Sequence, residues 1–256
     1  MEFKDIICEY RDNIMRIILN RPERYNAFTI NTLKEMHFAL EKAELDENVR
    51  VIVLRGAGDK AFCAGGDLKE GGDPTHMTYW HMKVLHTIRA ITKPVIAAVN
   101  GWAVGGGCTL HIVCDLSIAA ETAKFAQTDP RIGSFDGGFG AAYLARIVGE
   151  KKAREIWFLC RTYTAHEALE MGLVNKVVRL TELDAEVERW CKEIIEISPT
   201  ALKFMKAAFN ADTDHIFGFQ TMSEIAVKLF WESEEAKIYK KKFLEKKKTK
   251  THTQSD

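Results

Sequence analysis

Two clusters of glycine can bring backbone N–H groups to one reacting oxygen. FCAGGD (62–67) comes shortly after the apolar run 49–56, and WAVGGGC (102–108) directly follows the apolar run 95–101. Glycine lets a ligand approach main-chain N–H groups closely, and neither cluster matches the phosphate-binding patterns GxxxxGK(S/T) and GxGxxG. Two such loops can instead donate hydrogen bonds to an oxygen that becomes negative during a reaction, which is an oxyanion hole. Two ordinary tight turns are the alternative.

A third concentration of polar and turn-forming residues carries two carboxylates. In FAQTDPRIGSFDGGFG (125–140), Asp129 and Asp136 are separated by Pro130 and Gly133, so we expect both on a loop where they can face one cleft. Two structural roles stay open. Asp136 can cap the helix that follows it, and Asp129 can be a turn residue before Pro130.

The cysteines and histidines argue against metal, redox and hydrolase chemistry. The cysteines stand singly in apolar segments without ligand spacing, which predicts reduced, mostly buried thiols and no metal site. They are Cys8, Cys63, Cys108, Cys114, Cys160 and Cys191. His76, His81 and His86 follow the first glycine cluster in a polar stretch and are expected at the surface or at the rim of a substrate site. No histidine stands beside a serine-containing nucleophile elbow, so a serine or cysteine hydrolase has little support.

Short strands and helices must position these groups. Residues 6–20 read as two strands around a turn at Asp12 and Asn13, and a helix with apolar repeats begins after a cap at Thr29. Further strands are expected at 49–56, 95–101, 116–120 and 124–127. This alternation predicts an α/β fold with parallel strands rather than a sandwich or a bundle.

The second half of the chain becomes increasingly helical. Helices are expected at 140–149, 150–160 and 165–171, followed by a strand at 173–178. Thr181 is a candidate cap for the next helix, Pro199 opens another, and 214–248 looks helical throughout.

We therefore divide the chain into a core, residues 1–198, and a helical region, residues 199–256, that ends in a lysine-rich tail. The last helices carry more large apolar residues than one face needs, among them Phe217, Phe219 and Leu229. A neighbouring subunit or the same chain can cover them.

Composition limits the class of partner. The 36 basic and 36 acidic residues give zero net charge, which argues against a dedicated nucleic-acid binder. No run of about 18 apolar residues exists for a membrane span, and the first residues lack a secretory signal, so we predict a cytoplasmic protein with no membrane partner. The charge is uneven, because residues 237–256 hold eight lysines against Glu245 and Asp256.

Several spaced motifs resemble the crotonase (enoyl-CoA hydratase/isomerase) superfamily. They are NRPERYNAF (20–28), FCAGGDLKE (62–70), KPVIAAVNGWAVGGGCTL (93–110), CDLSIAAETAKFAQTD (114–129) and the stretch 131–178. The resemblance implies a spiral of ββα units, a helical carboxy-terminal trimerisation region, and homotrimers or dimers of trimers. It also implies acyl-CoA thioester substrates, with coenzyme A as part of the substrate and no separate cofactor.

Within the superfamily, QTDPRIGSFDGGFG and the residues after it look like the 1,4-dihydroxy-2-naphthoyl-CoA synthase branch of menaquinone biosynthesis. That branch closes a ring on 2-succinylbenzoyl-CoA by intramolecular Claisen condensation. The resemblance implies that backbone N–H groups of Gly66 and Gly106 hold the thioester oxygen and that Asp129 is the base for the α-proton. It places Ser134 and Asp136, with Thr128, at the second carbonyl group.

The resemblance also implies a set of substrate and coenzyme A contacts. They are Arg24 or Tyr25, Ala64, Gly65, Asp67, Leu68, Trp102, Gly105 and Lys246, and Trp231 stands where the branch has a tyrosine. Ordinary hydratases place one glutamate just after GGGC and another after a glutamine–proline pair, and Thr109 and Asp129 stand at those positions here. An enoyl-CoA hydratase, a 2-ketocyclohexanecarboxyl-CoA-type ring-opening hydrolase, and a non-catalytic CoA-binding or RNA-binding scaffold are the alternatives.

Overall fold

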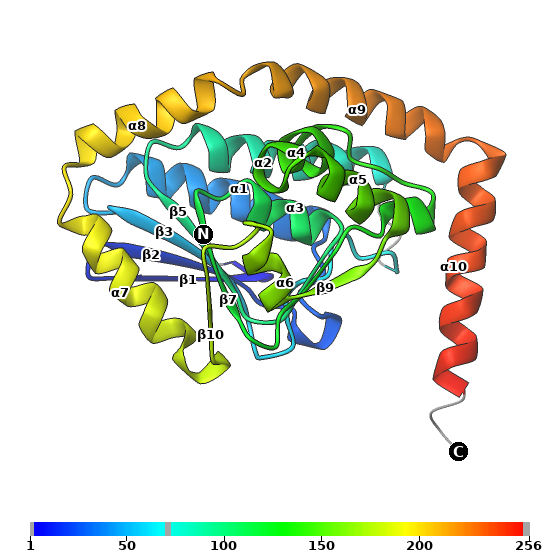
Figure 1. Cartoon of the computed structure of the whole chain (residues 1–256), viewed down its shortest axis with the longest axis horizontal. Helices are drawn as coiled ribbons and strands as arrows, with labels where there is room; N and C mark the ends of the chain where they lie inside the picture. Colours follow the sequence, from blue (N-terminus) through cyan, green and yellow to red (C-terminus); the bar gives the residue numbers. More distant parts are fainter. Residues whose placement is uncertain (1–2, 70–72, 253–256) are drawn as a thin grey trace.

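Two sheets form the frame of the molecule (Figure 1). The computed structural model describes residues 3–69 and 73–252, and of residues 246–252 it describes only the helical backbone. The six-stranded sheet has the order β1 (Ile6–Arg11), β2 (Ile14–Leu19), β3 (Val51–Gly56), β5 (Val95–Val99), β7 (Leu116–Ala120) and β10 (Lys176–Val178). Its neighbours are parallel, except that β1 and β2 form an antiparallel hairpin through Asp12 and Asn13, which both have positive φ.

The four-stranded sheet is smaller and carries the segments of chemical interest. Its order is β4 (Ala61–Cys63), β6 (Trp102–Val104), β8 (Lys124–Ala126) and β9 (Thr162–Thr164). The first three strands are parallel, so their carboxyl ends lie at one edge of the sheet, and β9 is antiparallel to β8. Both glycine clusters and the Asp129 segment therefore leave the sheet at that edge.

Helices cover both faces of the larger sheet. α1 (Ile30–Leu45) and α2 (Pro74–Ala90) pack on one face, and α7 (Leu183–Ile195) packs on the other through Leu183, Val187 and Cys191. The shorter helices are α3 (Gly106–Ile112), α4 (Leu144–Val148), α5 (Glu150–Leu159) and α6 (Ala165–Glu170). Single turns of 3₁₀-helix lie at η1 (Pro22–Arg24), η2 (Asp129–Ile132) and η4 (Leu180–Glu182), and η3 (Gly138–Tyr143) is a π-helix.

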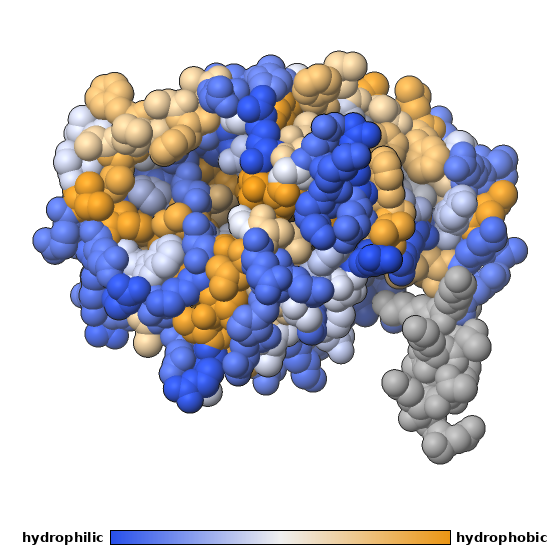
Figure 2. All heavy atoms as spheres, viewed as in Figure 1, coloured by the Kyte–Doolittle hydropathy of each residue, from blue (hydrophilic) through white to orange (hydrophobic). Residues whose placement is uncertain are grey.

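The carboxy-terminal helices wrap around the outside of this body (Figure 1). They are α8 (Pro199–Ala211), α9 (His215–Trp231) and α10 (Glu234–His252). The side chains of Phe204 and Phe209 on α8 are each 70% exposed, and Met222 and Leu229 on α9 are 66% and 67% exposed. Figure 2 shows apolar side chains along the upper edge, where α8 and α9 run. The outer face of these helices is thus not covered within the described chain.

The predicted α/β body with a helical carboxy-terminal region is confirmed, and Thr29 caps α1 as expected, since its side chain accepts the N–H of Thr32. The expected helix 140–149 is instead a π-helix followed by α4, and the strand 173–178 is limited to β10. Thr181 is not the cap of α7, because a 3₁₀ turn places Glu182 there. The expected long helix 214–248 is broken between Trp231 and Glu234. Among the described residues, none of the helices combines the length and apolar character that a membrane span needs.

One buried lysine attaches α8 to the body. Lys206 is only 8% exposed, and its Nζ donates to the carbonyl oxygens of Ile88 and Lys93 at 3.0 Å and to Asp115 Oδ2 at 2.7 Å. We expect Lys206→Met to lower the free energy of unfolding by about 2 kcal/mol, because three acceptors lose their donor while Asp115 keeps its charge. Denaturant unfolding followed by circular dichroism measures this effect.

The matched control is Lys203→Met, one turn earlier on the exposed face of the same helix. It introduces the same side chain without breaking a buried contact and should change stability by less than about 0.5 kcal/mol. Equal losses in the two variants would show that the buried contacts of Lys206 do not hold α8 in place.

Candidate active site

The two glycine clusters lie side by side at one edge of the four-stranded sheet. β4 and β6 are parallel neighbours paired through Cys63 and Ala103. Gly65 has φ of 84°, and a Cβ at that position would lie only 2.9 Å from the carbonyl oxygen of Val104, with the backbone nitrogen of Gly106 at 3.5 Å. Any side chain at position 65 would therefore be strained and would crowd the second loop, which explains why glycine is required there.

The backbone N–H groups of Gly66 and Gly106 lie on the two glycine loops, at positions where the local structure leaves them without an obvious backbone acceptor. Gly106 is the first residue of α3, where a helix leaves N–H groups without an intrahelical acceptor. On either side of Gly66, the N–H of Phe28 donates to Gly65 O and the N–H of Asp67 donates to Phe28 O, both at 2.9 Å. Because alternate N–H groups of an extended segment point to opposite sides, the N–H of Gly66 is directed away from Phe28.

Asp129, at the start of η2, lies against the second glycine loop. A Cβ on Gly105, which has φ of 54°, would lie only 2.6 Å from Asp129 Oδ1. The backbone oxygen of Asp129 also accepts the N–H of Ser134 at 2.9 Å, which closes the turn. The residue is half-buried. Burial, with the nearby charge of Asp136 as the second cause, raises the pKa of Asp129 to about 7.

Asp136 belongs to the same cluster. Its Oδ1 accepts the N–H of Gly138 at 3.0 Å. The N-cap of the following helix is nevertheless Gly137, so Asp136 is not the helix cap that the sequence left open. Burial raises the pKa of Asp136 to about 6, while hydrogen bonds from the backbone of Gly138 and Gly140 and from the side chains of Thr109 and Gln220 act in the lowering direction. The two carboxyls are close enough for the charge of Asp136 to raise the pKa of Asp129, which agrees with their expected proximity, and a cleft that both face stays a prediction.

The two carboxyls titrate as a pair. Asp136 receives more hydrogen bonds than Asp129 and is the more acidic of the two, so it ionises first. Its negative charge then opposes ionisation of Asp129, which holds its proton until about pH 7. Asp129 is therefore a stronger base than an aspartate in water would be.

His81, on α2, supports the Gly106 loop. Its Nε2 lies 3.1 Å from the carbonyl oxygen of Gly106, and its ring stacks on Phe28 with 4.9 Å between the ring centroids. Burial lowers the pKa of His81 to about 4, so the ring is neutral at pH 7 and Nε2 carries the donated proton. His81 and His86 are both half-buried, and the position of His81 beside Gly106 fits the second expectation, the rim of a candidate substrate site. His86 stacks on Phe217 at 3.6 Å, and His76 is exposed as expected.

Among the residues expected to contact coenzyme A, Asp67 forms an ion pair within the chain, whereas three others have exposed side chains. The carboxylate of Asp67 accepts two hydrogen bonds from the guanidinium group of Arg24, one at each oxygen, at 2.6 Å and 3.0 Å. It accepts a third from Arg21 at 3.2 Å. This ion pair fixes the first glycine loop to η1. Tyr25, Leu68 and Trp102 are 49%, 45% and 40% exposed, so their side chains are open to a ligand. Ala64 is half-buried beside them.

Four of the expected site residues remain, and only Thr128 and Ser134 lie on the segment that carries the two carboxyls. Thr128 and Ser134 flank η2 and are half-buried. Trp231 is half-buried at the end of α9, and its neighbour Phe230 packs on Phe135 with 5.8 Å between ring centroids. The side chain of Lys246 falls outside the described residues.

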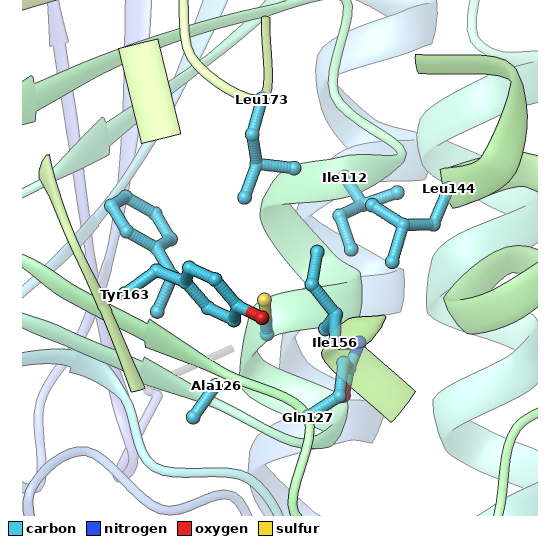
Figure 3. Close-up of a pocket in the computed structure, with 9 residues that line it drawn as sticks. Ile112, Ala126, Gln127, Leu144, Ile156, Tyr163 and Leu173 are labelled. Carbon is cyan, nitrogen blue, oxygen red and sulfur yellow. The ribbon is translucent and has the colours of Figure 1, made fainter. Parts of the chain in front are cut away.

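A small cavity behind the Asp129 segment is not the substrate site. Figure 3 shows Tyr163, Ile156 and Leu173 around it, with Gln127 at its wall. Its volume of about 10 Å³ leaves room for one water molecule at most. Gln127 is fully buried, and its Nε2 lies 3.3 Å from Thr109 Oγ1, so the cavity adjoins the network that supports Asp136.

The buried thiols are poor nucleophiles, as the sequence indicates. Cys108 Sγ lies 3.6 Å from Nε2 of His111, but burial raises the pKa of Cys108 to about 12 and lowers that of His111 to about 3. An ion pair between them is therefore excluded at neutral pH. In the described ranges, His, Cys, Asp and Glu side chains form no group of three that could hold a metal ion.

The geometry agrees with a comparison against known families. Residues 9–254 match the family model for enoyl-CoA hydratase/isomerase. The chain belongs to this family. Its fold is accordingly the crotonase type.

Solved structures of enoyl-CoA hydratases have the same fold. An enoyl-CoA hydratase from Mycobacterium avium subsp. paratuberculosis K-10 superposes with a TM-score of 0.86 at 26% identity, over 94% of this chain and 99% of that one. An enoyl-CoA hydratase from Bacillus anthracis gives 0.79 at 31% identity, over 87% and 90%. An enoyl-CoA hydratase/isomerase from Xanthobacter autotrophicus Py2 gives 0.83 at 32% identity, over 92% and 89%.

Within this enoyl-CoA hydratase/isomerase fold, the sequence assigns no site role to Phe28 or Gln220 and indicates His81 only as one of three histidines at the surface or at a substrate rim. Phe28 and His81 flank Gly106, and Gln220 reaches Asp136 from α9. Only His81 had a usable signal, because the buried residues of α2 recur at helical spacing after it, at Val84, Leu85 and Ile88.

Proposed function

We propose that this protein forms an enolate from an acyl-CoA thioester and joins its α-carbon to a second carbonyl group of the same acyl chain. This is the intramolecular Claisen condensation of 1,4-dihydroxy-2-naphthoyl-CoA synthases, with 2-succinylbenzoyl-CoA as substrate. The observation that supports it best is Asp129, a carboxyl of raised pKa held against Gly105 and beside Asp136.

In the proposed reaction, each group has one role. The thioester oxygen accepts the N–H groups of Gly66 and Gly106, which are placed for the charge that develops on it. The carboxylate of Asp129 removes the α-proton, and the enolate carbon attacks the second carbonyl carbon, forming the ring bond. Ser134 and Asp136 orient that second carbonyl group, and one water leaves overall.

Water addition by a glutamate pair has less support. Thr109 stands where hydratases resembling this chain place a glutamate. Its hydroxyl lies 3.4 Å from the Gly105 carbonyl oxygen and receives the amide of Gln127, so it serves a structural network. A threonine cannot act as the second acid–base group, because its hydroxyl does not ionise near neutral pH.

Mass spectrometry of three incubations distinguishes the candidate reactions. We expect purified enzyme to convert 2-succinylbenzoyl-CoA to a product that has lost one water. A product of crotonyl-CoA that has gained water would instead identify a hydratase, and the same gain with a cyclic β-ketoacyl-CoA a ring-opening hydrolase. Failure to exchange the α-protons of any of these thioesters in D₂O would favour a non-catalytic scaffold.

The rate of α-proton exchange should depend on pH with a midpoint near 7. Asp129 must be ionised to accept a proton, so kcat/KM falls as pH drops through the pKa of about 7. A free aspartate would give a midpoint near 4. Deuterium incorporation into the thioester between pH 5 and 9 measures the profile.

Asp136→Asn is the control for the electrostatic cause of this midpoint. It removes the charge that raises the pKa of Asp129, so the midpoint should move down by about one unit. An unchanged midpoint would show that the charge of Asp136 does not set the basicity of Asp129.

The proposed partners are acyl-CoA and a second copy of the chain. Lys237, Lys240 and Lys241 line a shallow depression on α10, where their charge suits the phosphates of coenzyme A. The exposed apolar side chains of α8 and α9 suit self-association into trimers or dimers of trimers. Sedimentation analysis tests the assembly.

A further inference from the structure

The helix α9 holds the segment that carries Asp136. The N–H of Gly137 donates to Ser223 Oγ at 2.7 Å, and the N–H of Phe139 donates to Gln220 Oε1 at 2.7 Å. These side chains are 9% and 6% exposed, so both hydrogen bonds are protected from water. Gln220 and Ser223 are three residues apart and therefore share one face of α9.

The local structure explains why these contacts are needed. Gly138–Tyr143 is a π-helix, and the N–H groups in the first turn of any helix lack an acceptor within the helix. α9 supplies an acceptor for one of them, Phe139, and for Gly137, which directly precedes the helix. The approach is also close, since a Cβ on Gly138 would lie 2.5 Å from the Cα of Gln220. The backbone of the loop therefore rests directly on α9.

Gln220 has a second contact, with the carboxyl itself. Its Oε1 is used by Phe139, which leaves the amide N–H₂ to face Asp136, where its donation favours the ionised carboxylate. One side chain thus fixes both the backbone that follows Asp136 and the carboxyl group.

We propose that Gln220 is a positioning residue, which holds Asp136 and its loop against the base Asp129 from the carboxy-terminal helix α9. The roles of Asp129 and Asp136 rest on the proposed function, whereas the hydrogen bond by which Gln220 holds the segment after Asp136 does not. Gln220 itself need not touch the substrate.

Other charged groups near the loop are already engaged. Glu224, which directly follows Ser223 on α9, is 6% exposed and forms an ion pair with Lys228 at 3.2 Å. From α2, Arg89 lies over the ring of Phe139 at 5.5 Å, and His86 meets the same ring edge-on. The charge of Asp136 raises the pKa of Asp129 on η2, so the pH response of Asp129 reports on the contact between Gln220 and Asp136.

Two substitutions separate the two contacts. Gln220→Leu removes both the acceptor for Phe139 and the donor to Asp136. Gln220→Glu keeps an acceptor for Phe139 but replaces the donor by a carboxylate oxygen. Thr221→Val is the matched control, because the Thr221 hydroxyl is exposed and donates only to Phe217 O of its own helix.

The loop is tested by amide hydrogen exchange of the Phe139 N–H, which needs no substrate. We expect exchange about tenfold faster in Gln220→Leu and little changed in Gln220→Glu and Thr221→Val. An unchanged Phe139 amide in Gln220→Leu would overturn the proposal, whether or not the protein turns over an acyl-CoA.

The carboxyl contact is tested by the pH profile of α-proton exchange with 2-succinylbenzoyl-CoA. Gln220→Leu should make Asp136 the weaker acid, so that Asp129 ionises first and the midpoint falls by about one pH unit. In Gln220→Glu the added carboxylate opposes ionisation of both aspartates, so the midpoint should not fall. A merely structural role would lower the rate and leave the midpoint in place, which would contradict the proposed contact. If wild-type protein exchanges no α-proton, the proposed function fails, and the amide measurement alone decides whether Gln220 holds the loop.

Discussion

Asp129→Asn is expected to reduce α-proton exchange and turnover of an acyl-CoA by about 1,000-fold, the largest effect we foresee for one side chain. Asparagine matches the shape of the Asp129 carboxyl beside Gly105 but cannot accept a proton from carbon. The affinity for coenzyme A should stay the same, because the oxyanion and CoA contacts come from other residues. Deuterium incorporation and CoA titration measure the two quantities.

The same substitution should stabilise the fold at alkaline pH. Asp129 ionises near pH 4 in the unfolded chain but only near pH 7 in the folded protein, so the carboxyl destabilises the fold progressively between these pH values and fully above pH 7, and a neutral amide removes the penalty. We expect a gain of about 2 kcal/mol at pH 8 that vanishes at pH 4, where the carboxyl is protonated. Thermal unfolding at both pH values tests this.

Asp59→Asn is the matched control, since Asp59 is exposed on a loop far from the cluster. It should change neither exchange nor stability. If Asp129→Asn kept more than a tenth of the wild-type exchange rate, Asp129 would not be the base. If Asp129→Asn stabilised the protein without loss of activity, the result would support the burial of Asp129 but contradict its role as the base.

The sequence predicts this site in part because its main groups follow strand ends. Glycine at positions 65 and 105 has a local cause, positive φ, and the clustering of glycine in the sequence already indicates an unusual backbone there. Asp129 and Asp136 share one short loop, so their proximity follows from chain connectivity. Glycine clusters and neighbouring carboxyls can be predicted from the sequence, because each of these features is contained within a few consecutive residues.

Other parts of the site depend on contacts between distant segments. Gln220 meets Phe139 across 81 residues, and Ser223 meets Gly137 across 86. Neither residue has a local pattern that indicates its partner, because glutamine and serine occur on any polar helix face. His81 reads as part of a polar stretch, and only the packing of α2 places its ring over Phe28.

Local conformation also departs from periodicity at the site. The apolar spacing of residues 140–149 predicts an α-helix, yet the first part is a π-helix held by α9. Hydrogen bonds from outside the segment stabilise a backbone form that the residues alone would not favour. Such exceptions are common near functional sites.

Gly106→Ala is expected to lower kcat by about 100-fold while the fold is retained. A Cβ at position 106 would lie 2.8 Å from Cζ of Phe28 and 3.2 Å from the ring of His81. Phe28 is 3% exposed and stacked on His81, so neither ring can move freely. The backbone of residue 106 must shift instead, which displaces its N–H from the thioester oxygen.

Two further variants make this expectation specific. Gly218→Ala, on α9, adds a methyl group that meets no atom within 4 Å and should leave kcat unchanged. The double variant Gly106→Ala with Phe28→Leu makes room for the methyl group and should recover at least part of kcat, because the backbone can return. If the single variant kept full kcat, the N–H of Gly106 would not serve the oxyanion. If relief of the clash restored nothing, displacement of that N–H could not be the cause of the loss.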